Sequence, residues 1–200
     1  MPTALSPLGQ QTDEELIAAY QRGSSEAFEL LIARYKNPLT NFVYRFLGNF
    51  DECEDVVQET FIRVYRKKHS YRPEARFSTW IYTIAGNLAK TRLRQRDRHK
   101  FVSLSPSRKR DGEEITFEVP DTRYAADRQA DSTLKNEIIQ RALNSISPKF
   151  REVVVLRDVQ ELSYEEIAEV TGLSLGTVKS RINRGRTLLQ KLLRDIVEDD

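Results

Sequence analysis

The sequence has 200 residues, which is enough for one ordinary domain or two small ones, and its net charge is only +2. Cys53 is its single cysteine, which excludes an intrachain disulfide and a cysteine metal site, and neither His69 nor His99 has a second ligand at metal spacing. No apolar run approaches the ~20 residues that span a bilayer, and the first residues lack the pattern of a signal peptide, so we expect a cytoplasmic protein without membrane insertion.

The near-neutral total hides a segregation of charge along the chain. Residues 90–110 are dominated by Lys and Arg, residues 111–131 are mainly acidic, and residues 174–194 contain no acidic side chain. Blocks of this kind indicate a nucleic-acid partner, with a solvated connector between the basic parts.

The first elements are predicted to be helices. Residues 1–11 have no periodicity, and we expect them to be disordered. Thr12 and Glu15 have the spacing of a capping box, which opens a short helix. A longer helix follows and ends at Gly48, and Pro38 is expected to interrupt or kink it.

The next predicted helix begins in the acidic residues 51–55, which suit a helix N-terminus, and ends near Lys68. Its outward face carries Asp55, Gln58, Glu59, Ile62 and Arg66. An exposed isoleucine among charges suggests a docking surface, although periodicity alone favours an ordinary solvated face.

A further helix is predicted from Thr79 to about Lys100, with Ser78 as its cap. Beside its apolar face lies a separate stripe at helical spacing, formed by Trp80, Thr83, Asn87, Lys90 and Arg94. Such a stripe can bind a nucleic-acid strand, because bases stack on aromatic rings for ~1–3 kcal/mol each while cations follow the phosphates. The alternative is that Trp80 belongs to the core and the basic end is a solvated helix terminus.

Residues 101–131 are predicted to be a flexible linker, since they are poor in apolar residues and change from basic to acidic. A second domain, residues 132–196, is expected to contain four helices. The β-branched run at 153–155 has helical flanks and no partner strand, and Ser147 with Pro148 has the pattern of a helix start. The predicted fold class is therefore all-α, with two small helical domains.

The last two helices have the pattern of a helix-turn-helix. Ser163 and Glu166 form a capping box, Gly172 ends the first helix, and Ser174 caps the second. Gly185 lies on the apolar face of the second helix, which suggests a close approach of another backbone.

The polar face of that second helix carries Thr177, Lys179, Ser180, Arg181, Asn183, Arg184 and Arg186. A basic, amide-bearing helix after a glycine turn is typical of a major-groove reader, whereas the alternative is a solvated amphipathic hairpin. Arg184 and Asn183 suit guanine and adenine edges, each discriminating by ~1–3 kcal/mol. Cations beside them are better placed for phosphates, which position the protein without specifying sequence.

Residues 51–65, 77–89, 147–157 and 162–186 together resemble the extracytoplasmic-function, or group 4, sigma factors of the sigma-70 family. The resemblance covers residues 14–195 in the order and spacing of the family. It implies that residues 12–100 are a region 2-like domain, that residues 132–196 are a region 4-like domain, and that the chain initiates transcription in response to stress. It also implies core RNA polymerase and promoter DNA as partners, an anti-sigma factor as a third partner, and no catalysis, cofactor or metal.

The resemblance also assigns three sets of residues. Asp55, Gln58, Glu59, Ile62 and Arg66 match the surface that docks on core polymerase. Arg76, Trp80, Thr83, Asn87, Lys90 and Arg94 match the part that melts and holds the single-stranded −10 element. On the last helix, Lys179, Ser180, Asn183 and Arg184 match the residues with which the family contacts bases and phosphates of the duplex −35 element, and the helix pattern adds Thr177, Arg181 and Arg186 to this set. Asn183 stands where some members of the family carry an aromatic residue.

Two other functions are compatible with parts of the sequence. A stand-alone dimeric regulator could use the same helix-turn-helix, but that hypothesis gives no role to the stripe from Trp80 to Arg94. A DNA recombinase or nuclease would need a nucleophile such as Ser24 or Ser25, and both fit better as helix caps. The acidic residues 51–55 sit at a helix start without converging partners for a hydrolytic metal.

Overall fold

The computed structural model describes residues 10–103 and 128–198, and these residues form helices and the turns between them, with no strand. The predicted all-α class is therefore confirmed. The elements, in chain order, are α1 (Asp13–Gln21), α2 (Ser25–Leu47), α3 (Phe50–Lys67), η2 (Lys68–Ser70), α4 (Phe77–Ser103), α5 (Arg128–Ser145), α6 (Pro148–Val154), η3 (Val155–Val159), α7 (Tyr164–Thr171) and α8 (Leu175–Glu198).

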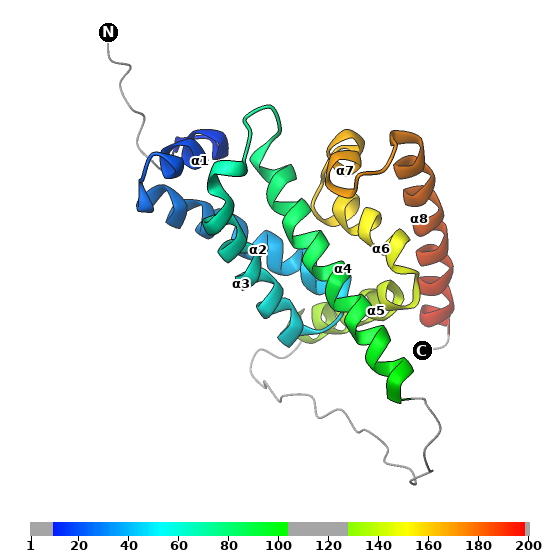
Figure 1. Cartoon of the computed structure of the whole chain (residues 1–200). Helices are drawn as coiled ribbons and strands as arrows, with labels where there is room; N and C mark the ends of the chain where they lie inside the picture. The colour runs from blue at the N-terminus through cyan, green and yellow to red at the C-terminus, as the bar shows by residue number, and fades with distance from the viewer. Residues whose placement is uncertain (1–9, 104–127, 199–200) are drawn as a thin grey trace.

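The helices form two groups that pack against each other (Figure 1). The first helical group, α1–α4, and the second helical group, α5–α8, are joined through residues 104–127, and this part of the predicted linker (residues 101–131) lies outside the described residues. The long helix α4 packs on α2 and α3 on one side and on α7 on the other, and α2 also contacts α5, α6 and η3. The buried apolar side chains of both groups belong to one continuous cluster. The two predicted domains are thus in extensive contact.

Several helix ends have the predicted caps. The Thr12 hydroxyl accepts from the Glu15 N–H at 3.2 Å, and the Glu15 carboxylate accepts from the Thr12 N–H at 2.8 Å. Gly48 ends α2 with φ +70°, a left-handed conformation that favours glycine. These ends are fixed by local chemistry, which is why the sequence predicts them.

The start of α4 differs from the prediction. The helix begins at Phe77, before Ser78, and the Phe77 N–H donates to a carboxylate oxygen of Glu14 at 3.1 Å. The acceptor comes from α1, so the local sequence around Ser78 carries no sign of it. At its other end α4 continues to Ser103, and α5 begins at Arg128, so both helices extend into the predicted linker.

Pro38 does not interrupt α2, which runs continuously from Ser25 to Leu47. A proline inside a helix removes one hydrogen bond and costs ~3 kcal/mol. The neighbouring side chains Tyr35, Leu39 and Phe42 are all buried in the shared core. Their packing offsets the cost of the proline, and the break expected there is absent.

The segment between α6 and α7 was not predicted in detail. Residues 153–155 are helical and buried, as their flanks indicated, but the helix then widens into the π turn η3. Glu161 follows with φ +58°, a left-handed conformation that is costly for a residue with a Cβ. This turn places α7 against α4.

Candidate nucleic-acid and polymerase interface

The helix-turn-helix formed by α7 and α8 has the predicted chemistry. The Ser163 hydroxyl accepts from the Glu166 N–H at 3.1 Å, and the Glu166 carboxylate accepts from the Ser163 N–H at 2.8 Å. Gly172 ends α7 with φ +70°, and the Ser174 hydroxyl accepts from the Thr177 N–H at 3.3 Å at the start of α8. The turn between the helices is therefore fixed at both ends.

Gly185 brings α8 close to α6, as predicted. A Cβ at Gly185 would lie 2.6 Å from Cγ2 of Val154, a distance that side chains do not tolerate. Val178 and Ile182 are fully buried on the same face of α8. This packing leaves the opposite face of α8 directed away from the protein.

The seven predicted −35 residues lie on this outer part of α8, where Lys179, Ser180, Asn183, Arg184 and Arg186 are exposed and Thr177 and Arg181 are half-buried. Within the described part of the chain, neither Arg181 nor Arg184 forms an ion pair. Lys179 lies over the Tyr164 ring, with Nζ 5.8 Å from the ring centroid. The middle of the face is accordingly available to a ligand.

Arg186 is the exception on this face. Its guanidinium forms a two-pronged ion pair with the Asp158 carboxylate, and Nε donates to Oδ2 at 3.0 Å. The hydrogen bonds with Asp158 raise the pKa of Arg186 further above its ordinary value. A phosphate would have to compete with this carboxylate, so Arg186 is less available than the sequence suggested.

The predicted −10 stripe lies along α4. Trp80 is half-buried, and its ring packs against Tyr71 and Phe77 with centroids 5.4 and 6.0 Å away. Trp80 is therefore part of the core edge while keeping an accessible side. Farther along the stripe, Thr83 is half-buried, and Asn87 and Arg94 are exposed.

Two cations of the predicted −10 set form ion pairs with the second helical group. The Arg76 guanidinium lies 2.7 Å from a Glu166 oxygen, and the Lys90 ammonium lies 3.1 Å from Oε1 of Glu152. Glu152 is only 5% exposed, so its charge is removed from water. These contacts place α6 and α7 over part of the α4 stripe, which the sequence did not reveal because the partners lie far apart in the chain.

Glu166 serves both the α7 cap and this contact between the groups. Burial alone would raise the pKa of its carboxyl group. The hydrogen bonds from Ser163 and the charge and hydrogen bond of Arg76 outweigh burial, so the pKa of Glu166 is lowered. The carboxylate is thus held in its charged form.

Arg151 joins the two groups at their other end. Its buried guanidinium donates to the backbone oxygens of Phe46 at 2.7 Å, Asn144 at 2.8 Å and Ile146 at 3.2 Å. These oxygens lie at or just beyond the C-terminal ends of α2 and α5, where carbonyls lack partners within the helix. Gly48 lies beside the same junction, because a Cβ there would fall 2.4 Å from Oδ1 of Asn144.

The outward face of α3 carries the predicted polymerase-binding residues. Asp55, Gln58, Ile62 and Arg66 are exposed and Glu59 is half-buried. Asp55 forms an ion pair with Arg92 of α4 at 3.0 Å, and Glu59 pairs with Arg63 at 3.0 Å. Ile62 is 42% exposed, so it is an apolar contact open to solvent.

Tyr65 extends this face and was missed in the sequence. It is the most exposed of the large apolar side chains in the described ranges, at 61%. Its ring lies 6.3 Å from Tyr20 and 6.2 Å from Phe28, and those two rings stack at 4.5 Å. The three aromatic rings come from three helices, so only the folded structure brings them together.

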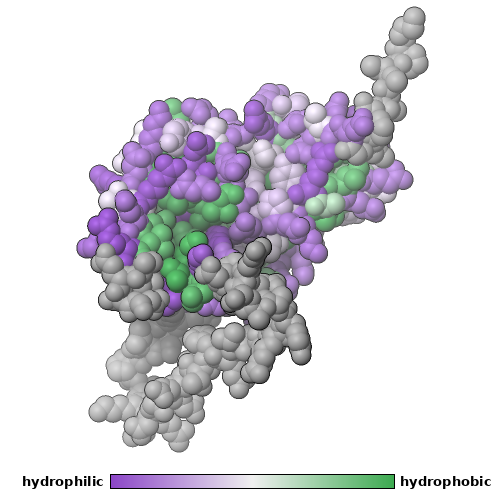
Figure 2. Space-filling view, turned by 180° about the vertical axis from the view of Figure 1, so that it is seen from behind, coloured by the Kyte–Doolittle hydropathy of each residue, from purple (hydrophilic) through white to green (hydrophobic). Residues whose placement is uncertain are grey.

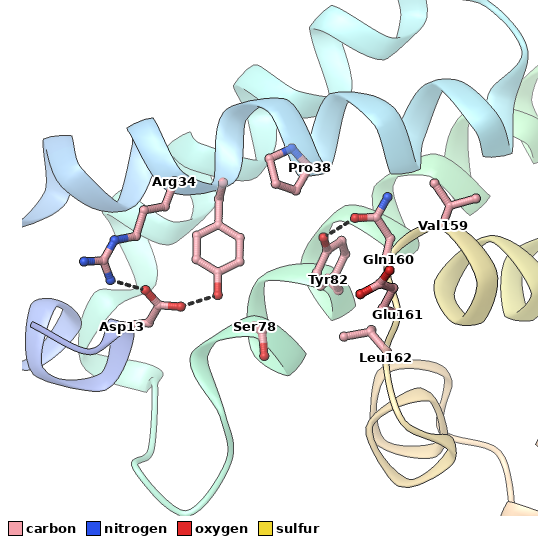
Figure 3. A pocket seen from close by; sticks show the side chains of 10 residues that line it. Asp13, Arg34, Pro38, Ser78, Tyr82, Val159, Gln160, Glu161 and Leu162 are labelled. Carbon is pink, nitrogen blue, oxygen red and sulfur yellow. Dashed lines mark hydrogen bonds and ion pairs between the residues drawn. The ribbon is translucent and has the colours of Figure 1, made fainter. Parts of the chain in front are cut away.

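A cavity of about 410 Å³ lies where α1, α2 and α4 meet residues 159–162 (Figure 3). Asp13 accepts hydrogen bonds from Arg34 at 2.7 Å and from the Tyr35 hydroxyl at 2.5 Å, and the Tyr82 hydroxyl donates to Gln160 at 2.6 Å. Burial, together with Asp13, raises the pKa of Tyr35, which keeps its hydroxyl protonated. The hydrogen bond from Tyr82 to Gln160 crosses between the two helical groups, so this cavity lies at their junction.

Metal chemistry has no support within residues 10–103 and 128–198, where no cluster of three or more His, Cys, Asp or Glu side chains could hold an ion. The same residues include no helix that is both long enough and apolar enough to cross a bilayer. Figure 2 shows an apolar area on the side where α5 and α8 lie, and the exposed large apolar side chains of these helices are Leu134, Ile139, Leu175 and Leu188.

Comparison with known families gives two matches that follow the two helical groups. The family model for Sigma-70 region 2 matches residues 31–99, and the model for Sigma-70, region 4 matches residues 136–189. The first match spans α2 to α4 and the second spans α5 to α8.

Known relatives resemble the chain over almost its whole length. The ECF RNA polymerase sigma factor SigW of Bacillus subtilis is 36% identical over 90% of this chain and 96% of its own length. The RNA polymerase sigma-H factor of Pseudomonas aeruginosa is 32% identical over 96% of this chain and 99% of its own. The ECF RNA polymerase sigma-E factor of Escherichia coli is 34% identical over 94% of this chain and 97% of its own.

Two solved structures share the fold. CnrH in complex with the cytosolic domain of CnrY superposes with a TM-score of 0.67 at 27% identity, covering 92% of this chain and 97% of that chain. The sigma factor RpoE of Bartonella quintana, in complex with the anti-sigma factor NepR, superposes with a TM-score of 0.63 at 28% identity, covering 84% of this chain and 96% of that chain.

Proposed function

Because the chain belongs to the extracytoplasmic-function group of the sigma-70 family, we propose that it directs RNA polymerase to promoters and takes part in melting the DNA there. The observation that carries this function is the presence of two separate surfaces, the outer face of α8 and the α4 stripe, in one chain of this family. A duplex reader alone would need only α8, so the stripe favours a sigma factor over a stand-alone dimeric regulator.

The two surfaces divide the work. Residues 132–196 form the duplex-reading domain, in which α8 lies in the major groove of the −35 element. Ser180, Asn183 and Arg184 reach base edges, while Lys179 and Arg181 contact phosphates. Thr177 completes the base-reading row, and Arg186 contributes only where a phosphate displaces Asp158.

Residues 12–100 form the domain that holds the separated −10 strand. The accessible side of Trp80 stacks on a base, Thr83 and Asn87 offer hydrogen bonds, and Lys90 and Arg94 follow the phosphates. Arg76 adds a cation from the loop before α4. Taking a base out of the duplex stack costs a few kcal/mol, which these contacts offset.

The α3 face supplies the attachment to core polymerase. Ile62 offers a small apolar contact in a ring of polar groups formed by Asp55, Gln58, Glu59 and Arg66. An apolar centre with a polar rim is the usual composition of a protein interface. Tyr65 lies on the same helix and enlarges the apolar part of this surface.

Further properties follow from the same role. The chain is a binding subunit rather than an enzyme, needs no cofactor, and works in the cytoplasm, where its polymerase is found. An anti-sigma factor is a further partner, as NepR is for RpoE of Bartonella quintana.

The function is tested by reconstitution. The purified chain is mixed with bacterial core RNA polymerase, the complex is isolated by gel filtration, and fragmented genomic DNA is transcribed. Sequencing of the RNA 5′ ends should give start sites that depend on the chain and share two upstream motifs. A chain that never co-elutes with core polymerase, or that adds no start sites, contradicts the proposal. Ile62→Glu should reduce co-elution, whereas Lys36→Glu, on α2, should not.

A further inference from the structure

A cavity of about 300 Å³ opens between the start of α6 and the first turns of α8. Its lining includes Lys149, Thr177, Ser180, Arg181 and Arg184. We propose that this cavity seats one backbone phosphate of the DNA whose bases α8 reads, with Lys149 of α6 as a phosphate ligand. The inference rests on the proposed −35 role of α8 and adds a contact from a different helix.

The positive charge of the cavity lining favours an anionic ligand. Lys149, Arg181 and Arg184 all line it, and its lining includes no carboxylate. None of these three cations forms an ion pair with any residue in the described ranges. Like charges gathered around one small space repel each other, and an anion between them relieves that repulsion. Arg186, by contrast, already has Asp158 as its partner.

The packing of α6 on α8 holds Lys149 at this place. Gly185 permits the close approach, since a Cβ there would lie 3.4 Å from both Cβ and the carbonyl oxygen of Phe150. The Lys149 ammonium lies over the Phe150 ring, 5.0 Å from its centroid. Lys149 is therefore kept beside α8. Gly176 leaves the cavity open, because a Cβ at that position would meet no heavy atom within 4 Å.

The position of the cavity indicates DNA as the source of the phosphate. Ser180 and Arg184 line the cavity and also belong to the row proposed to face base edges. When a helix lies in the major groove, the phosphates that border the groove come to the sides of the helix. A phosphate in the cavity would fix how α8 is rotated in the groove, while contributing no sequence preference of its own.

The test uses the complex of the full chain with bacterial core RNA polymerase. Duplexes that the complex prefers are first enriched from a randomised pool, and binding of Lys149→Ala is then measured at several salt concentrations. The slope of log K against log salt should become shallower by roughly 0.9, the value for one lost phosphate contact. Affinity should fall by roughly threefold to tenfold at 0.1 M salt, equally on preferred and base-substituted duplexes.

A scan with uncharged methylphosphonate linkages locates the phosphate. One such linkage should weaken DNA binding by the unsubstituted protein as much as Lys149→Ala does. The same linkage should have no further effect on DNA binding by the Lys149→Ala variant. Lys149→Arg should restore the salt slope. The control is Lys191→Ala, an exposed cation on α8 about 10 Å beyond Arg184 along the helix axis, which should leave the scan unchanged.

The outcomes separate the two proposals. If no duplex is enriched, base reading by α8 is wrong and the phosphate site falls with it. If a duplex is enriched but Lys149→Ala keeps the original slope, or no linkage couples to it, only the phosphate site is overturned. A loss confined to preferred duplexes also overturns it, because a phosphate contact does not distinguish bases.

Discussion

Lys90 of α4 and Glu152 of α6 form an ion pair of 3.1 Å between the two helical groups, and the Glu152 carboxylate is almost completely buried. Oε1 of Glu152 has no hydrogen-bond donor in good geometry. Its negative charge is therefore stabilised by the electrostatic attraction of the nearby Lys90 ammonium and not by a hydrogen bond. Lys90 is also proposed to hold a phosphate of the −10 strand. One ammonium group cannot serve both partners fully, so the contact between the groups and strand binding oppose each other.

The first prediction concerns the unequal burial of this pair. The Lys90 side chain is 29% exposed and that of Glu152 is 7% exposed. Removing Lys90 leaves a buried charge, whereas Glu152→Gln leaves a cation that water can reach. We expect Lys90→Met to lower the free energy of unfolding by about 2–4 kcal/mol and Glu152→Gln by about 1 kcal/mol or less. Urea denaturation followed by circular dichroism measures both; equal losses would contradict this role of burial.

Glu152→Gln should also release Lys90 for DNA. We expect this variant to bind a single-stranded oligonucleotide that carries the −10 motif about threefold to tenfold more tightly than the unsubstituted chain, a change of about 1 kcal/mol. Fluorescence anisotropy with the full chain measures the affinity. Glu169→Gln, an exposed change on α7, is the matched control. Unchanged affinity for Glu152→Gln would mean that the ion pair does not limit access to α4.

The third prediction is a dependence of stability on pH. Burial alone would raise the pKa of Glu166, but its interactions with Ser163 and Arg76 stabilise the charged carboxylate more strongly. In the folded protein the pKa is therefore lowered from 4.5. The stabilisation is present above the unfolded pKa and is lost as pH falls through the lower, folded pKa. Glu166→Gln should therefore reduce stability at pH 7 and have a smaller effect near pH 3. Melting temperatures at the two pH values test this, and an equal difference at both would contradict it.

The left-handed residue before α7 gives the fourth prediction. Glu161 has φ +58°, which costs a residue with a Cβ about 1 kcal/mol. Glu161→Gly removes this strain, but the greater conformational entropy of glycine in the unfolded chain offsets part of the benefit. We therefore expect the free energy of unfolding to rise by about 0.5 kcal/mol. The melting temperature should rise by about 1–2 °C. Glu165→Gly, inside α7, should lower it, because glycine costs about 1 kcal/mol in a helix.

The fifth prediction uses Cys53, whose thiol is fully buried and lies 3.3 Å from the Thr40 carbonyl oxygen. Burial and the nearby Glu54 carboxylate raise the pKa of the thiol to about 11. The reactive thiolate is therefore scarce and inaccessible at pH 8. Labelling with Ellman's reagent should be slow in the native protein and should accelerate with the unfolded fraction in urea. Rapid labelling without denaturant would contradict this burial.

The features that the sequence predicted correctly depend on residues close together in the chain. The capping box of Ser163 and Glu166 and the left-handed Gly172 are determined within one helical turn, so a short pattern suffices. Gly185 is similar, because a glycine on an apolar helix face usually marks the close approach of a neighbouring helix. The all-helical fold follows from the same local signals.

The features that it missed depend on contacts made only after folding. The start of α4 is moved by the carboxylate of Glu14, and Arg76 meets Glu166 of a different helical group. The π turn η3 follows a run of valines whose pattern fits an ordinary helix equally well. Sequence periodicity records which face is buried, but it does not record what covers that face.

Arg151 binds the two groups chiefly through main-chain oxygens of Phe46, Asn144 and Ile146, with one further hydrogen bond to the Asn144 side chain. Every amino acid carries a main-chain oxygen, so the three acceptor positions can change identity in evolution without losing these main-chain bonds, provided that the backbone keeps its path. The donor cannot change so freely, since no other side chain offers a rigid fork of donors. Paired substitutions across this joint should therefore be rare among homologues, and methods that infer contacts from correlated mutation should overlook a junction that the structure makes obvious.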